Sequence, residues 1–191
     1  MVEVIADTNI LINLYGAFLH RDQNIKKLKP HTQLLKLIEN NKIKIYATNQ
    51  ILKEFAFSKG SSFEAIKNFQ TFFKKYVKPI SFSNEDVDMI NKLTHALGHN
   101  KISYTNEYNV LMRDQILFEQ AERQGERNFA DATIMAESIV ASLPIVTINQ
   151  KDFEGCKYCK TILEKYNITF RPKVLSVHDL ISILKSQEQI F

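Results

Sequence analysis

The sequence predicts an α/β fold with a central parallel sheet, because strand-like segments alternate with amphipathic helical segments along the chain. Three strand-like segments carry this prediction. Residues 2–6 are mostly apolar, "KIKIYAT" alternates and is rich in β-branched residues, and "LPIVTIN" is a continuous apolar run typical of buried parallel strands. The 191 residues are enough for one domain with a full core, so we expect a single domain over 1–191.

The remaining elements follow from apolar spacing and from residues that start or stop helices. Thr48 or Asn49 is expected to cap the third helix, and Asn84 and Gly98 to bound the fifth. Short strands are expected within 77–83 and 173–177. The predicted helices cover residues 9–18, 32–40, 50–57, 63–76, 84–98, 106–125, 126–142 and 178–187. The helical stretch at about 61–126 is long for a simple crossover, so we interpret it as a helical insertion.

Composition limits the class of protein. The chain is 45% hydrophobic, and no apolar run reaches the roughly 18–20 residues of a membrane span. Glu3 and Asp7 interrupt the start of the chain, which does not resemble a signal peptide, so we expect a cytoplasmic protein with no membrane partner. The net charge of +4 permits a polyanionic partner. The lysine clusters "NIKKLKPHTQLLK" and "FFKKYVKP" are either solvated helix faces or nucleic-acid contacts.

The two cysteines, Cys156 and Cys159, form a CxxC pair. Ordinary thiols, half of a zinc site and a redox pair all stay open. A zinc site needs about four ligands. His178 and His99 could complete one, but neither has motif spacing.

Carboxylates occur where strands are expected to end. Asp7 follows the first strand, Asn149 and Asp152 follow the late strand, and Glu54 lies on the helix after "KIKIYAT". Asp131 opens the helix that precedes the late strand. Because ligands bind beyond the carboxyl ends of parallel strands, these residues could share one edge of the sheet.

Each acid also has a purely structural interpretation. Asp7 could cap the next helix, and Glu54 could pair with a neighbouring lysine. Asp131, three residues after Asn128, could close a capping box, and Asp152 could be an ordinary loop acid. Their joint placement favours a metal site, since clustered carboxylates are costly without a cation. Oxygen ligands on short side chains suit Mg²⁺ or Mn²⁺.

Three segments together resemble the PIN-domain family of VapC-like ribonucleases: "VIADTNILINLY", "ATNQILKEFAF" and "NFADATIMAESIVASLPIVTINQKDF". The resemblance implies a three-layer α/β/α fold and metal-dependent cleavage of RNA with Mg²⁺ or Mn²⁺. It implies that Asp7, Glu54 and Asp131 are the ligand acids.

The resemblance also assigns supporting roles. Thr8 or Asn9 would orient Asp7, and Thr147 would hydrogen-bond into the site. Asn149 stands at the position of the family's fourth acid and adds no negative charge. Asp152 is the candidate to compensate as a further catalytic and metal-binding acid.

The same resemblance makes this chain a candidate toxin of a toxin–antitoxin pair, with RNA as substrate, a small antitoxin protein as partner and homodimerisation as a family habit. The alternative is a catalytically degenerate PIN-like module that binds RNA or protein. A redox protein using Cys156 and Cys159 is a third class. A phosphatase of the haloacid-dehalogenase type needs an acid two residues after Asp7, where this chain has Asn9.

Overall fold

The computed structural model describes residues 1–23, 25–57, 63–102, 130–154 and 163–188. The chain divides into two compact units. The first contains Met1–Ser81, Leu143–Gln150 and Lys173–Phe191, and the second contains Phe82–Ser142 and Lys151–Pro172.

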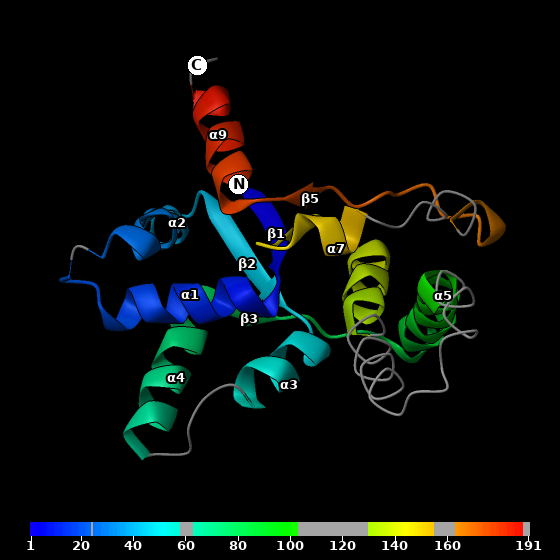
Figure 1. The fold of residues 1–191 in the computed structure, drawn as a ribbon, viewed down its shortest axis with the longest axis horizontal. Coiled ribbons are helices and arrows are strands. Elements are labelled where there is room, and N and C mark those ends of the chain that lie inside the picture. Colours follow the sequence, from blue (N-terminus) through cyan, green and yellow to red (C-terminus); the bar gives the residue numbers. More distant parts are fainter. Residues whose placement is uncertain (24, 58–62, 103–129, 155–162, 189–191) are drawn as a thin grey trace, which may run out of the picture. The chain divides into compact units, whose positions relative to one another are not determined.

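The first unit is built on a five-stranded sheet (Figure 1). Its strands are β1 (Val2–Ala6), β2 (Ile43–Ala47), β3 (Val77–Pro79), β4 (Ile145–Val146) and β5 (Val174–Leu175). They lie in the order β3-β2-β1-β4-β5, and every neighbouring pair is parallel. The predicted α/β class with a central parallel sheet is therefore confirmed.

The central strand β1 sets the register on both sides. Val2 pairs with Ile43 and Ile5 with Tyr46 on one side, and Ile5 pairs with Ile145 on the other. Val4, Ile5 and Ala6 are completely buried, as expected for a parallel strand in a sheet covered on both faces. Only Ile145 and Val146 of the predicted strand 143–149 pair as strand residues.

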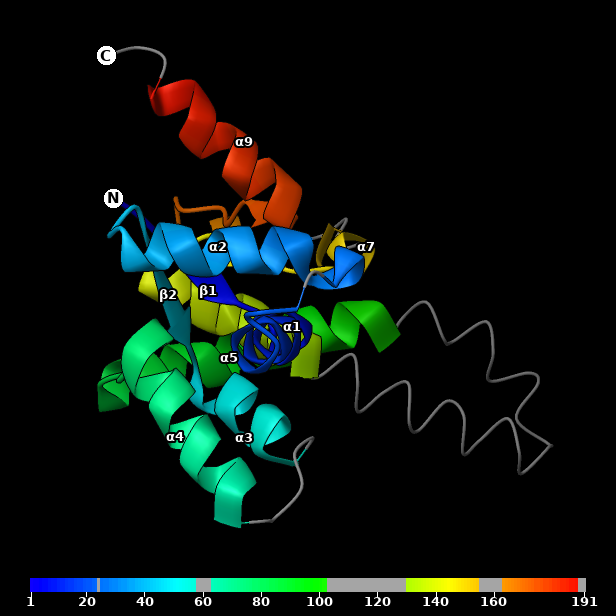
Figure 2. The ribbon, with the colours of Figure 1, turned by 90° about the vertical axis from the view of Figure 1, so that its left-hand side faces the viewer.

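In the first unit, helices begin two residues after the ends of β1 and β2, and Figure 2 shows these elements from the side. Thr48 Oγ1 accepts a bond from Ile51 N at 3.5 Å, so Thr48 is the cap of the third predicted helix. The second helix begins three residues before its predicted start, at Lys29. The helices are α1 (Thr8–Leu19), the 3₁₀ turn η1 (Lys26–Leu28), α2 (Lys29–Glu39), α3 (Asn49–Phe57), α4 (Phe63–Tyr76) and α9 (Val177–Glu188).

An aromatic cluster holds α1, α3 and α4 together. Tyr15 of α1 lies 5.9 Å from Phe55 of α3 and 5.4 Å from Phe72 of α4, measured between ring centroids. Phe55 also stacks on Phe69 at 5.1 Å. Phe55 and Phe72 are completely buried. Because burial of aromatic rings dominates local packing energy, this cluster fixes the position of α3 against α1.

The second unit contains α5 (Asn84–Ile102) and a helix over residues 130–141. Two predicted boundaries of α5 are wrong. The helix continues past Gly98, and Ser83 rather than Asn84 caps it. Ser83 Oγ accepts from Asp86 N at 3.2 Å while Asp86 Oδ2 accepts from Ser83 N at 2.9 Å, which is a reciprocal capping box.

The predicted insertion at about 61–126 begins with α4, which lies in the first unit next to β3. The predicted helix 106–125 and the pair Cys156 and Cys159 lie outside the described residues. Among the helices that the structure describes, none has the length and apolar character of a membrane span.

Candidate functional site

The order of the strands reverses between β1 and β4. The chain adds β2 and β3 on one side of β1 and then β4 and β5 on the other, so the strand order reverses between β1 and β4. Ligands in open parallel sheets bind at this reversal, beyond the carboxyl ends of the strands. Asp7 directly follows β1 and Thr147 directly follows β4, so both stand at that point.

Asp7 is held at this edge by its backbone and by both carboxylate oxygens. Its N–H donates to Val146 O at 2.9 Å, and the residue caps α1. Oδ1 accepts from Thr8 N at 2.7 Å, and Oδ2 accepts from the Thr147 hydroxyl at 2.8 Å. Asp7 is only 6% exposed, so its carboxylate is fixed in a largely dry position.

Glu54 is connected to Asp7 through Thr8. The Thr8 hydroxyl donates to Glu54 Oε2 at 2.5 Å, while the Thr8 backbone N–H binds Asp7. Glu54 lies on α3 between Lys53 and the buried Phe55, and it is half-buried. The packing of Phe55 against Tyr15 therefore brings this carboxylate to the first turn of α1.

Gln50 is a further member of this network and was not among the predicted site residues. Its side-chain Nε2 donates to Glu54 Oε1 at 2.8 Å, one helical turn earlier on α3. The spacing of four residues was the available signal, since such pairs meet on a helix surface. Both oxygens of Glu54 are thus bound by neutral donors.

The segment after β4 contributes Thr147 and Asn149. Thr147 is completely buried, and its hydroxyl accepts from Asn149 N at 3.0 Å while donating to Asp7. The Asn149 side chain is exposed. Asn9, in the first turn of α1, also hydrogen-bonds to Asp7 and lowers the pKa of that carboxyl.

The environment of Asp7 raises the pKa of its carboxyl group. Burial raises the pKa of Asp7, the bonds from Thr147 and Thr8 lower it, and the charge of Glu54 raises it again. Among the described residues, no Lys, Arg or His forms an ion pair with Asp7 or Glu54. Two neighbouring carboxylates are therefore held only by neutral donors.

The structure brings together Asp7, Thr8, Glu54, Thr147 and the backbone of Asn149. Asp131, at the start of the helix 130–141, and Asp152, within α7 (Gln150–Glu154), belong to the second unit. Their assignment to the same site stays a prediction. In the first unit, as far as the structure describes it, no three His, Cys, Asp or Glu side chains form a metal-binding group.

No family model matches the sequence, and no curated protein matches it. Among solved structures, a chain of the complex described as "VapBC2 from Rickettsia felis bound to a DNA fragment from their promoter" is similar to this protein. The TM-score is 0.50 and the identity 16%, and the match covers 92% of this chain and 98% of that chain. At this identity the similarity is one of fold, and it agrees with the predicted three-layer α/β/α class.

Proposed function

We propose that this protein is a metal-dependent endoribonuclease that hydrolyses RNA phosphodiester bonds with Mg²⁺ or Mn²⁺. One observation carries the proposal: Asp7 and Glu54 meet at the strand-order reversal, share Thr8, and have no cationic partner among the described residues. A divalent cation would offset the repulsion between these carboxylates, whose oxygens are the ligands that Mg²⁺ and Mn²⁺ prefer.

Carboxylate and amide oxygens are suitable ligands for such an ion. Asp7 and Glu54 would hold it, with the exposed Asn149 as a neutral oxygen ligand and with Asp131 and Asp152 as further acids. A bound ion would supply an activated water and stabilise the leaving oxygen in phosphodiester hydrolysis.

The other residues of the network position the carboxylates. Thr8, Asn9 and Thr147 orient Asp7, and Gln50 and Thr8 orient Glu54. Because each carboxylate receives its bonds from different elements, the relative position of the two acids is set by the fold before any metal or substrate binds.

The proposal also includes a role for this protein in the cell. The resemblance to VapC-like ribonucleases and the fold similarity to a chain of the VapBC2 complex support a toxin of a toxin–antitoxin pair. Such a protein would have RNA as substrate, a small antitoxin protein as partner and a homodimer as its assembly, and it would act in the cytoplasm.

Cleavage of RNA tests the proposal directly. Wild-type protein is incubated with total RNA and Mg²⁺ or Mn²⁺, beside Asp7→Asn, Asp131→Asn and the surface variant Asp88→Asn. We expect wild type and Asp88→Asn to cut, and Asp7→Asn and Asp131→Asn to lose activity. Absence of metal-dependent cleavage by wild type, or full activity of both site variants, would overturn the proposal.

A degenerate RNA- or protein-binding module is the second candidate. By the resemblance, Asn149 stands at the position of the family's fourth acid, and the described part of the first unit gathers only two carboxylates at the edge of the sheet. A wild-type protein that binds RNA equally well in EDTA and in Mn²⁺, without cutting it, would favour this function.

A further inference from the structure

A pocket lies in the first unit, away from the candidate site. It has a volume of about 360 Å³ and is formed by the segment after α1 and one side of α2. Asp7 caps the start of α1, whereas Arg21 in the pocket follows its end. Since the 12 residues of α1 span about 18 Å, the pocket and the carboxylates lie at opposite ends of this helix.

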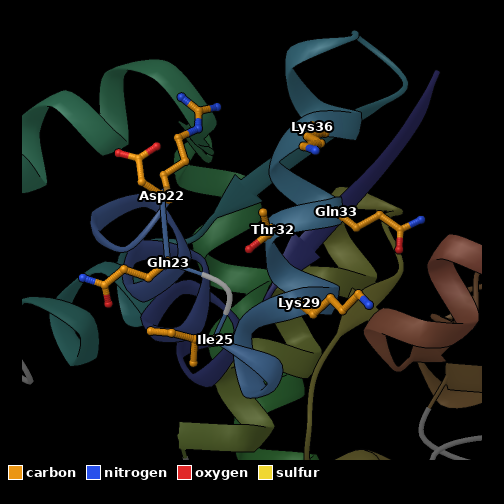
Figure 3. Close-up of a pocket in the computed structure, with 8 residues that line it drawn as sticks. Asp22, Gln23, Ile25, Lys29, Thr32, Gln33 and Lys36 are labelled. Atoms are coloured by element: carbon orange, nitrogen blue, oxygen red, sulfur yellow. The ribbon is translucent and has the colours of Figure 1, made fainter.

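One wall of the pocket is a polar stripe on α2. Lys29, Thr32, Gln33 and Lys36 line it at spacings of three and four residues, which places them on one helical face. Figure 3 shows these side chains along α2, with Gln23 and Ile25 on the segment opposite.

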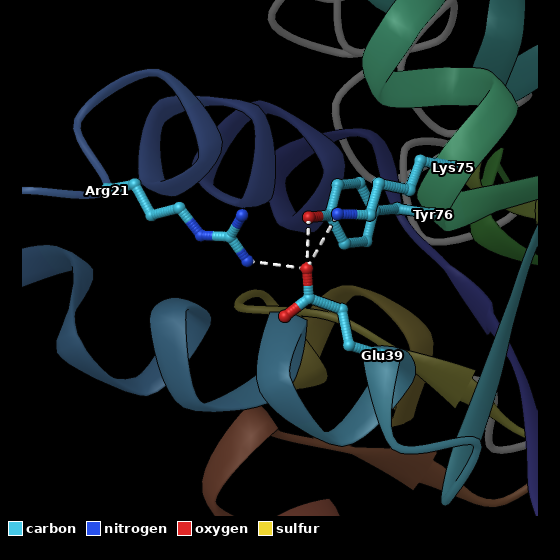
Figure 4. Close-up of polar contacts among 4 residues, drawn as sticks. All are labelled: Arg21, Glu39, Lys75 and Tyr76. Carbon is cyan, nitrogen blue, oxygen red and sulfur yellow. Dashed lines mark hydrogen bonds and ion pairs between the residues drawn. The ribbon is translucent and has the colours of Figure 1, made fainter.

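Arg21, one of the lining residues, forms an ion pair with Glu39. Its Nη2 donates to Glu39 Oε1 at 2.5 Å, and the same oxygen accepts from Tyr76 at 2.7 Å and Lys75 at 2.9 Å (Figure 4). A guanidinium has five N–H donors, so this contact leaves others for a ligand. Arg21 is therefore a pre-oriented cation rather than a freely rotating one.

The positive charge of the pocket is not balanced. Arg21 is paired with Glu39, so the unpaired cations of the lining are Lys29 and Lys36, which exceed its one acid, Asp22, by a single charge. Unlike Lys44 and Lys75, the two lysines of the stripe form no ion pair with the described part of the chain. Concave surfaces lined by one sign of charge concentrate ligands of the opposite sign.

We propose that this pocket binds a phosphate group. Arg21, Lys29 and Lys36 provide charge-assisted donors for the oxygens of a phosphate. The phosphate comes either from an RNA backbone or from a small phosphorylated molecule. This site does not depend on the proposed nuclease activity, because it contains none of the metal-site residues.

Binding is measured in EDTA, so that cleavage plays no part. The probes are inorganic phosphate, pyrophosphate and a short single-stranded RNA, the last at several salt concentrations. The double variant Lys29→Gln, Lys36→Gln is compared with Lys74→Gln, Lys78→Gln, which removes the same charge from exposed positions elsewhere in the first unit. Thermal unfolding checks that both variants are folded.

We expect the pocket variant to bind pyrophosphate about tenfold more weakly, because charge-assisted bonds are lost, and the control variant to bind as wild type does. If the RNA backbone is the source, the slope of log affinity against log salt falls by about 1.4, at about 0.7 per lost contact. Loss of pyrophosphate binding with unchanged RNA binding identifies a small phosphorylated ligand. Equal losses in both variants, or no binding of any probe by wild type, would overturn the proposal.

Discussion

Thr8 joins the two acidic residues of the candidate site through one side chain and one peptide group. Its N–H binds Asp7 and its hydroxyl binds Glu54, so β1, α1 and α3 meet at a single residue. A serine could make the same bonds, whereas valine would keep the shape and lose the hydroxyl. The site is therefore defined by the hydrogen bonds that each carboxylate accepts, and not only by the number of acids in it.

Thr147 supports Asp7 from the other strand, and its hydroxyl can be removed without changing its shape. We expect Thr147→Val to lower the free energy of unfolding by about 1–3 kcal/mol at neutral pH, because buried polar atoms lose their partner. Urea denaturation measures this change. Thr71→Val, an exposed threonine bonded to Lys67 O, is the control and should change stability by less than about 0.5 kcal/mol. Equal effects of the two variants would contradict the assigned role.

Gln50 orients Glu54, and its replacement should weaken metal binding without unfolding the protein. Outer residues that orient metal ligands typically contribute about 10–100-fold in affinity. We expect Gln50→Leu to lower the affinity for Mn²⁺ by at least about tenfold. The affinity is measured from the Mn²⁺ dependence of the unfolding temperature. The exposed Gln70→Leu on α4 is the matched control. A variant with unchanged Mn²⁺ dependence would remove Gln50 from the site.

Part of the site could be read from the sequence and part could not. Asp7 and Thr147 follow recognisable strands, so their meeting at one sheet edge was predictable from parallel topology. Gln50 was not predicted, because its role depends on which side of α3 faces α1. That orientation comes from the packing of Phe55 on Tyr15, which no local pattern reveals.

At the scale of elements, Glu39 connects the ends of α1, α2 and α4. Bonds from Tyr76, Lys75 and Arg21 lower the pKa of Glu39 to about 2 from the ordinary value of 4.5. A carboxyl group whose pKa is lowered by folding stabilises the protein at pH values above its ordinary pKa. This stabilisation is lost as the pH falls through the pKa of the folded state. We expect wild type to lose more stability than Glu39→Gln between pH 4.5 and about 2. Thermal unfolding across this range measures the difference, and parallel curves would contradict it.

The aromatic cluster is the second connection between elements. Phe55→Ala should lower the free energy of unfolding by about 3–5 kcal/mol, the usual cost of deleting a buried phenylalanine side chain. Because Glu54 is the next residue, the variant should also bind Mn²⁺ more weakly. Denaturant titration and Mn²⁺ titration measure the two effects, with Phe55→Leu expected to retain most of both. A loss below about 1 kcal/mol would show that other contacts position α3.

The type of each helix or strand was easier to predict from the sequence than the residues at which it begins and ends. The amphipathic spacing of residues 63–76 predicted α4 over its full length. In α5, the Ser83–Asp86 capping box outweighs the alternative cap at Asn84, and Gly98 lies inside the helix instead of ending it. Glycine weakens a helix interior by only about 1 kcal/mol, which the rest of a long helix can offset.

At the scale of the whole molecule, the uncompensated carboxylates predict that a metal stabilises the fold. We expect Mn²⁺ to raise the unfolding temperature of wild type and EDTA to reverse the change. A ligand at about 100 times its Kd contributes about 2.7 kcal/mol. Asp7→Asn should remain folded, since Asn also caps helices, but should lose this response. An equal response in Asp7→Asn would place the metal elsewhere.

The pairing of β1 with β4 also governs when the candidate site can form during synthesis. Ile5 pairs with Ile145, which lies 140 residues further along the chain, so the pair cannot form until that residue has been synthesised. Thr147, which binds Asp7, comes two residues after Ile145. At the usual pace of about 5–20 residues per second, translation needs about 7–28 s to cover the distance from Ile5 to Ile145. The growing polypeptide consequently carries an incomplete centre for most of its time on the ribosome. If the proposed activity holds, newly made protein is harmless to RNA until its late strands emerge.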